Sequence, residues 1–132
     1  MNNNVSVQSP NFGMAYKVGD LKNLSGYLNK QEPKAIGELS SKMEMAVEKL
    51  KNTKYADLIL RADDDGKKLY HNLSYRAPIF NDKGLVQESL VISSLFGDID
   101  NAVAEALEKE KAMTAAFEYA KKQEQILKDL CK

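Results

Sequence analysis

Residues 61–71, with the sequence RADDDGKKLYH, place three aspartates before a glycine and end on His71, the only histidine in the chain. Carboxylates near a glycine can bind calcium, as in an EF-hand loop, which also requires a bidentate glutamate at its last position. Aligning Gly66 with the loop glycine places Arg61 at the first ligand position and Asn72 at the last. Because neither residue is a carboxylate, we predict a turn between two strands and no metal site; a weak cation site is the alternative.

His71 is the second residue that could do chemistry, as a general base. A pocket around it could use its polar neighbours Tyr70, Tyr75 and Arg76. Strand alternation, however, places His71 on the same face as the leucines two residues before and after it. We therefore favour a hydrogen-bonded structural histidine, and we keep a small-ligand or enzyme pocket formed by these four residues as the alternative.

Other signals for catalysis or cofactors are weak. One histidine and one cysteine do not make a zinc site of the usual nitrogen and sulfur type. Cys131 lies beside the C-terminus, where no base is positioned to activate it. Neither G-x-G-x-x-G nor G-x-x-x-x-G-K-[ST] is found. We expect no cofactor, and we favour a protein that is not an enzyme.

The charge of the chain argues against two classes of partner. Lysine and arginine number 19, as do aspartate and glutamate, so the formal net charge is zero. Nucleic-acid binding depends on neutralising phosphates and is therefore not expected. No apolar run approaches the roughly 20 residues of a membrane span, and residues 1–18 do not resemble a signal peptide. We expect a cytoplasmic protein that binds neither nucleic acid nor membrane.

The length of 132 residues corresponds to one domain, which we assign to residues 1–132. Residues 1–10 form a polar N-terminal arm. Residues 12–18 alternate between apolar and small or polar side chains, which predicts a strand. Asp20 is a candidate N-cap for a helix over 21–30.

A second helix is predicted over residues 33–52. Pro33 suits its first position. Its apolar residues recur at steps of three and four and form one stripe, made of Ile36, Leu39, Met43, Ala46, Val47 and Leu50.

Three further strands are predicted within residues 55–62, 68–80 and 84–96. The segments DDDG and NDKG link them, and each ends in a glycine suited to the positive φ of hairpin loops. The fold we predict is α+β, with a four-stranded, mainly antiparallel sheet in the order β-α-α-β-β-β-α and with helices on one face. The place of the first strand in the sheet stays open.

A long C-terminal helix is predicted over residues 98–131, with Asp98 as its N-cap. A helix of about 33 residues spans roughly 50 Å, whereas a compact chain of this length has a diameter of roughly 36 Å. We therefore expect the helix to extend past the sheet by two to three turns.

The end of this helix carries an apolar stripe that needs a partner or must bend back onto its own domain. We predict a non-enzymatic interaction module that forms a homodimer through the stripe, with a different protein as the other kind of partner. The predicted interface residues are Met113, Ala116, Phe117, Ala120, Leu127 and Leu130.

Overall fold

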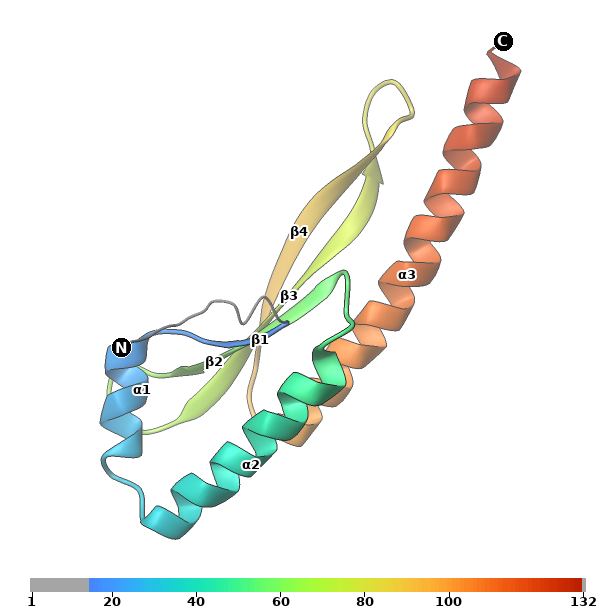
Figure 1. Cartoon of the computed structure of the whole chain (residues 1–132). Helices are drawn as coiled ribbons and strands as arrows, with labels where there is room; N and C mark the ends of the chain where they lie inside the picture. Colours follow the sequence, from blue (N-terminus) through green and yellow to red (C-terminus); the bar gives the residue numbers. More distant parts are fainter. Residues whose placement is uncertain (1–14, 132) are drawn as a thin grey trace, which may run out of the picture.

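A computed structural model describes residues 15–131 of the chain, and Figure 1 shows the arrangement. The predicted order of elements is confirmed, and the fold is α+β with one long C-terminal helix. No helix within residues 15–131 is long and apolar enough to cross a membrane. In chain order the elements are β1 (Tyr16–Val18), α1 (Leu21–Leu28), α2 (Pro33–Leu50), β2 (Ala56–Ala62), β3 (Leu69–Phe80), β4 (Val86–Leu95) and α3 (Ile99–Leu130).

The four strands form one mixed sheet in the order β1-β2-β3-β4. Strand β1 pairs in parallel with β2, while β2–β3 and β3–β4 are antiparallel, as predicted for these three strands. The strand predicted over 12–18 is present from Tyr16 to Val18. Residues 12–14 and the polar N-terminal segment predicted over 1–10 lie outside the described residues.

One face of the sheet is buried beneath α2 and α3. Leu58 pairs with Tyr16 on one side and with Leu73 on the other, so these three side chains share a face. All three are almost completely buried and pack in one apolar core with residues of both helices. The opposite face carries Leu90 and Ile92, each exposed over more than three fifths of its surface. These two side chains leave apolar surface on the open face, which in antiparallel sheets is usually polar.

The two predicted N-caps have different outcomes. Asp98 caps α3, because its side chain accepts a hydrogen bond from Asn101 N at 3.1 Å. Asp20 stands at the N-cap position of α1 but makes no side-chain cap hydrogen bond. Its carboxylate instead accepts from Arg61 Nη2 at 2.7 Å, so that part of the prediction is wrong. The charged partner on β2 competes with the cap for the same oxygens.

The DDDG segment is a hairpin loop between β2 and β3, as predicted. Asp63 Oδ1 accepts from the backbone N–H groups of Lys67 at 2.8 Å and Lys68 at 3.3 Å. These bonds lower the pKa of the Asp63 carboxyl. Gly66 has a φ of 64°, which side chains other than glycine rarely adopt.

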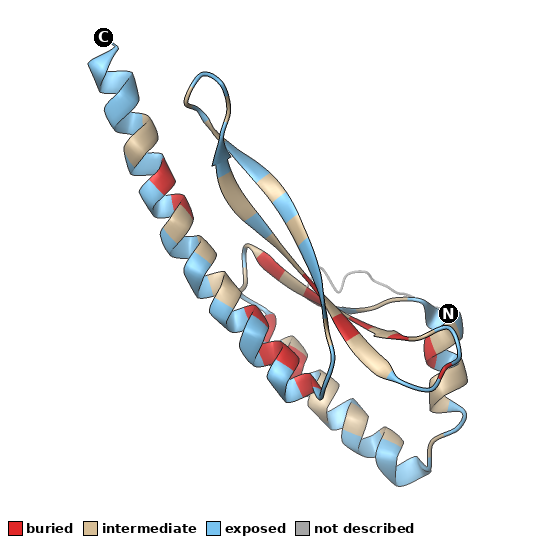
Figure 2. Ribbon diagram, turned by 180° about the vertical axis from the view of Figure 1, so that it is seen from behind, coloured by how far each residue is buried: buried red, intermediate tan, exposed pale blue. Residues whose placement is uncertain are grey.

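The molecule has two parts of different construction, which we call the body and the arm. The arm consists of residues 76–90, the far end of the β3–β4 hairpin, and residues 111–131 of α3; the body is the rest of the described chain. The arm exists because β3 has 12 residues and β4 has 10, whereas β2 has only 7. Figure 2 shows buried residues concentrated in the body and few in the arm.

The hairpin accompanies α3 almost to its end, which shortens the predicted overhang. Glu124 accepts a hydrogen bond from Val86 N at 2.6 Å, and Leu127 lies close against Gly84 in the hairpin loop. At the start of the arm, Phe117 stacks on Tyr55 with ring centroids 4.5 Å apart. The predicted overhang of two to three turns is therefore too long, because β3 and β4 extend along the helix as far as Leu127.

Candidate functional site

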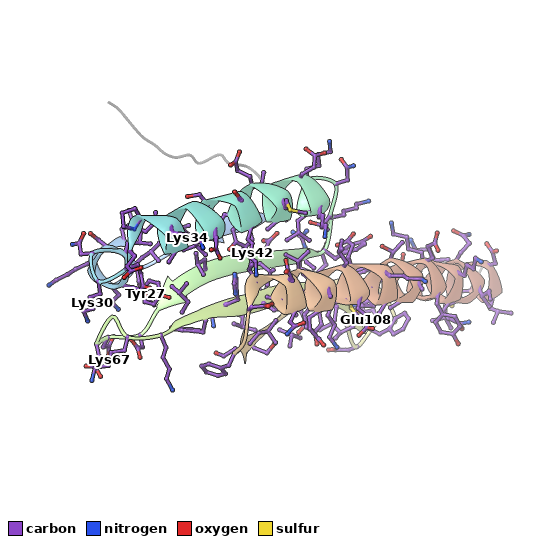
Figure 3. All side chains as sticks on the ribbon, turned by 90° about the horizontal axis from the view of Figure 1, so that it is seen from below. Tyr27, Lys30, Lys34, Lys42, Lys67 and Glu108 are labelled. Atoms are coloured by element: carbon purple, nitrogen blue, oxygen red, sulfur yellow. The ribbon has the colours of Figure 1, made fainter. Side chains whose placement is uncertain are left out.

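A cavity of about 690 Å³ opens at the end of the body where α3 begins. It lies between α2 and the sheet. The β2–β3 loop and residues 96–98, which connect β4 to α3, form its edges. Figure 3 shows Tyr27 and Lys42 extending from α1 and α2, with Lys67 on the β2–β3 loop. The lining combines apolar and charged side chains: Tyr27, Glu38, Leu39, Lys42, Leu60, Lys67, Lys68, Leu69, His71, Phe96, Asp98 and Ile99, with Gly97.

His71 lines this cavity and is the buried polar residue of the core, with 2% of its surface exposed. Its Nε2 lies 2.9 Å from the hydroxyl of Tyr16, which reaches it from β1 across β2. Its Nδ1 has no hydrogen-bond partner among the residues that the structure describes. A buried polar atom without a partner is unfavourable and requires an explanation.

The protonation of this pair follows from its burial. Burial lowers the pKa of His71 to about 4, so the ring is neutral at pH 7. Burial also raises the pKa of the Tyr16 hydroxyl, which therefore keeps its proton. If Tyr16 donates to Nε2, the imidazole proton must be on Nδ1. In this arrangement the Tyr16 hydroxyl donates its hydrogen bond to Nε2. The Nδ1–H group of His71, which lines the cavity, is then a donor without a partner among the described residues.

The charges around the cavity are mixed. Lys42 Nζ lies 3.6 Å from Asp100 and 3.9 Å from Asp98, so its charge is largely balanced. Lys67 and Lys68 form no ion pair within residues 15–131. Glu38 also lines the cavity and opposes them in charge. Three lysines and two carboxylates line the cavity, so its lining carries a formal charge of +1, which Asp100 beside Lys42 offsets.

The four residues predicted to share a pocket are not brought together. His71 and Tyr75 lie on the helix-covered face of β3, whereas Tyr70 and Arg76 alternate onto the other face. Tyr70 stacks on Phe96 at 5.7 Å, and Tyr75 lies beneath Lys109 of α3. Arg76 forms an ion pair with Glu88 and donates to the carbonyl of Lys54. Of the four, His71 alone lines the cavity.

The described residues contain no group of three or more histidine, cysteine, aspartate or glutamate side chains arranged to hold a metal ion. Asp63 is engaged in its own hairpin turn by the bonds described above. Cys131 is exposed at the end of α3.

The predicted interface residues divide between two environments. Phe117 and Ala120 are buried within the chain, and Phe117 stacks on Tyr55. Met113 and Ala116 are half-buried. Leu127 and Leu130 are exposed over 44% and 76% of their surface. The chain itself therefore covers the part of the predicted stripe that contains Phe117 and Ala120. The part that contains Leu127 and Leu130 is exposed.

A second row of residues runs along α3 beside the side that holds Phe117 and Ala120, and we call it the outer row. Its members recur at steps of four and three, the spacing of positions a and d in a heptad repeat. Tyr119, Ile126 and Leu130 supply its large apolar side chains and are exposed over 65%, 51% and 76% of their surface. The row consists of Ala112, Ala116, Tyr119, Gln123, Ile126 and Leu130.

Comparison of the chain with protein-family models, curated proteins and solved structures found no match.

Sequence reasoning missed Tyr16 as the partner of His71 and missed the lysines of the cavity. Tyr16 could be placed only once β1 was known to lie parallel to β2. The cavity draws its polar residues from α1, α2, the β2–β3 loop and the start of α3. The one local signal was the pair Lys67-Lys68, which directly precedes the strand that carries His71.

Proposed function

We propose that this protein is an interaction module that forms a homodimer through the outer row of α3. The observation that supports the proposal is a heptad-spaced row that carries the exposed side chains of Tyr119, Ile126 and Leu130. An exposed apolar row at this spacing is suited to a second helix with the same spacing. A second copy of this chain supplies such a helix.

The environment of α3 makes this use of the outer row compatible with the fold. The helix is already ordered on its inner side by Phe117, by Ala120 and by the bond from Val86 N to Glu124. Association therefore does not require ordering a free helix, which by itself would be marginal in water. Gln123, in the middle of the row, is the type of polar residue that fixes register in such pairs at some cost in stability.

The expected strength follows from the number of apolar side chains. Tyr119, Ile126 and Leu130 from two copies give six large groups, and burying their exposed parts contributes on the order of 10 kcal/mol. Association itself costs about 4–15 kcal/mol in lost freedom. Even with the lowest of these costs the net gain is only about 6 kcal/mol, which corresponds to a dissociation constant of roughly 40 μM. We therefore expect a weak, reversible dimer with a dissociation constant of tens of micromolar or more.

Sedimentation velocity over a range of concentrations tests the proposal. The wild type should shift from monomer to dimer between tens and hundreds of micromolar. The double variant Ile126→Lys/Leu130→Lys should stay monomeric and keep its circular-dichroism spectrum, because both positions are exposed.

The matched control is Leu90→Lys/Ile92→Lys, which changes two equally exposed apolar residues on the open face of the sheet. This variant should dimerise like the wild type. A wild type that is monomeric at high micromolar concentration would reject self-association and leave the row to a different protein. A dimer lost in the control but kept in the helix variant would move the interface to the sheet.

A further inference from the structure

We propose that the cavity beside His71 binds a small organic anion that carries a hydrogen-bond acceptor at its other end. The acidic group would lie between Lys67 and Lys68, and the acceptor would accept a hydrogen bond from His71 Nδ1–H. An apolar body would join the two groups and pack on the leucines of the cavity. The dimer proposed above does not enter into this inference, because the outer row lies at the opposite end of α3.

The unpaired nitrogen of His71 is the first support. Tyr16 occupies Nε2 at 2.9 Å, and Nδ1 is left with no partner in the described part of the chain. A donor buried without a partner destabilises the fold. Since His71 lines the cavity with 2% of its surface exposed, an acceptor atom of a ligand would reach Nδ1 there after a small shift of the lining side chains. An uncharged carbonyl suits this position better than a carboxylate, because burying an unbalanced charge is costly.

The lysines are the second, independent support. Lys67 and Lys68 line the cavity from the β2–β3 loop and have no ion-pair partner within residues 15–131. The loop that presents them is held on two sides. Lys30 donates to the carbonyl of Asp65 at 2.8 Å, and Asp63 accepts from the backbone of both lysines. These bonds fix the backbone of the loop, and the ammonium groups that it carries can bind a carboxylate through charge-assisted hydrogen bonds.

The size and lining of the cavity limit the ligand class. A volume of about 690 Å³ lies within the range of small-molecule sites, which are about 300–1,000 Å³. Leu39, Leu60 and Leu69 provide an apolar wall. Glu38 disfavours ligands with several negative charges, so a monoanion fits better than a polyphosphate. These features together select a monocarboxylate with an apolar chain and a distal carbonyl.

The monomethyl esters of linear dicarboxylic acids, from succinate to suberate, are suitable probes because each carries one carboxylate and one ester carbonyl. The protein is labelled with ¹⁵N in its histidine. Because the chain contains one histidine, its two ring nitrogens give a single assignable pair of signals. In the free protein these signals should report a neutral ring with the proton on Nδ1. One ester of the series should bind tightest and shift Nδ1 more than Nε2.

Four comparisons test the assigned roles. Alkanoates of matched length lack the carbonyl and should bind more weakly, and alkylammonium ions should not bind. The variant Lys67→Met/Lys68→Met should lose at least about tenfold in affinity, because it removes both cations that hold the acid. Glu38→Gln should bind more tightly because it removes repulsion. Lys111→Met, an exposed lysine on α3 outside the cavity, should bind like the wild type.

Two results would overturn the inference. The first is a ring proton on Nε2, which would mean that Tyr16 accepts the bond and that Nδ1 offers no donor. The second is a set of esters that leave the histidine signals unchanged at millimolar concentration. The lysine variants should fold like the wild type, because Lys67 and Lys68 are both exposed. A change in their affinity therefore reports on the site and not on folding.

Discussion

The body and the arm use the same chain to build two different kinds of structure. In the body, a four-stranded sheet packs on two helices, and the apolar core draws on β1, β2, β3, α1, α2 and α3. In the arm, a two-stranded hairpin packs on one helix, and Phe117 and Ala120 are its buried side chains on α3. None of the residues of the main core lies in the arm.

The difference follows from the number of layers that each part can form. A hairpin alone is marginal in water and needs further strands or a helix for stability. The arm has one helix on one face of two strands, so its remaining surfaces stay exposed, among them Phe80, Tyr119 and Ile126. The body contains the buried pair Tyr16 and His71 and the cavity, and its larger apolar core offsets their cost in stability. The arm instead presents apolar surface suited to a partner.

The largest expected effect is the loss of a core side chain in the body. Leu58 has no exposed surface, and Leu58→Ala should lower the free energy of unfolding by about 3–4 kcal/mol, as in other buried leucines. Urea unfolding followed by circular dichroism measures the change. Leu90→Ala, at 63% exposure on the open sheet face, is the control and should change stability by less than about 0.5 kcal/mol. Equal losses at the two sites would contradict the assignment of a single core face.

The second effect links the stability of the body to pH through His71. The pKa of His71 is lowered to about 4 in the folded state, while in the unfolded chain it is near 6.5. The unfolded state therefore binds the extra proton between these pH values, and stability falls as pH drops from about 6.5 towards 4. The loss should reach as much as about 3 kcal/mol for a shift of this size.

Urea unfolding of the wild type and of His71→Gln at several pH values isolates this contribution. The variant cannot titrate at this position, so the difference in stability between the two proteins should change through this pH range. Tyr16 keeps a hydrogen-bond acceptor in the variant. A constant difference from pH 7 to pH 4 would show that the pKa of His71 is not depressed.

The third and smallest effect concerns the contact between the arm and the body. Phe117→Leu keeps an apolar group but removes the stack on Tyr55, and it should cost about 1 kcal/mol. Hydrogen exchange should become faster in the hairpin loop over residues 81–85. It should stay unchanged over β2, which belongs to the body. Uniformly faster exchange would mean that body and arm unfold as one unit.

The sequence predicted the elements well because each has its own local signal. The three-four spacing after Pro33 identified α2, and the glycines at 66 and 84 marked the two hairpin loops. The parallel pairing of β1 had no local signal, since it depends on contacts between distant segments. The arm was missed for a related reason: the length of β3 and β4 beyond β2 becomes visible only when the strands are aligned.

The candidate site was harder to predict than the fold. Alternation correctly placed His71 on the face of Leu69 and Leu73, but grouping it with Tyr70 and Arg76 ignored that the same alternation sends those two to the opposite face. On α3, helical spacing alone gave one broad stripe. Only the position of the hairpin separates the side that holds Phe117 from the outer row that holds Ile126.

The measurement that tests the central claim most directly is a distance between two copies of the protein at the end of the outer row. Cys131 is exposed, follows Leu130 and is the only cysteine in the chain, so one nitroxide label can be attached there without further changes. Pulsed electron paramagnetic resonance then reports whether two labels lie at a defined separation. An antiparallel pair centred near residue 121 places them roughly 30 Å apart, and a parallel pair places them much closer.

We predict a narrow distance distribution at high micromolar concentration that disappears on dilution and in the labelled Ile126→Lys/Leu130→Lys variant. A sample without intermolecular coupling at that concentration would contradict the account, as would a distribution that survives the two lysine substitutions.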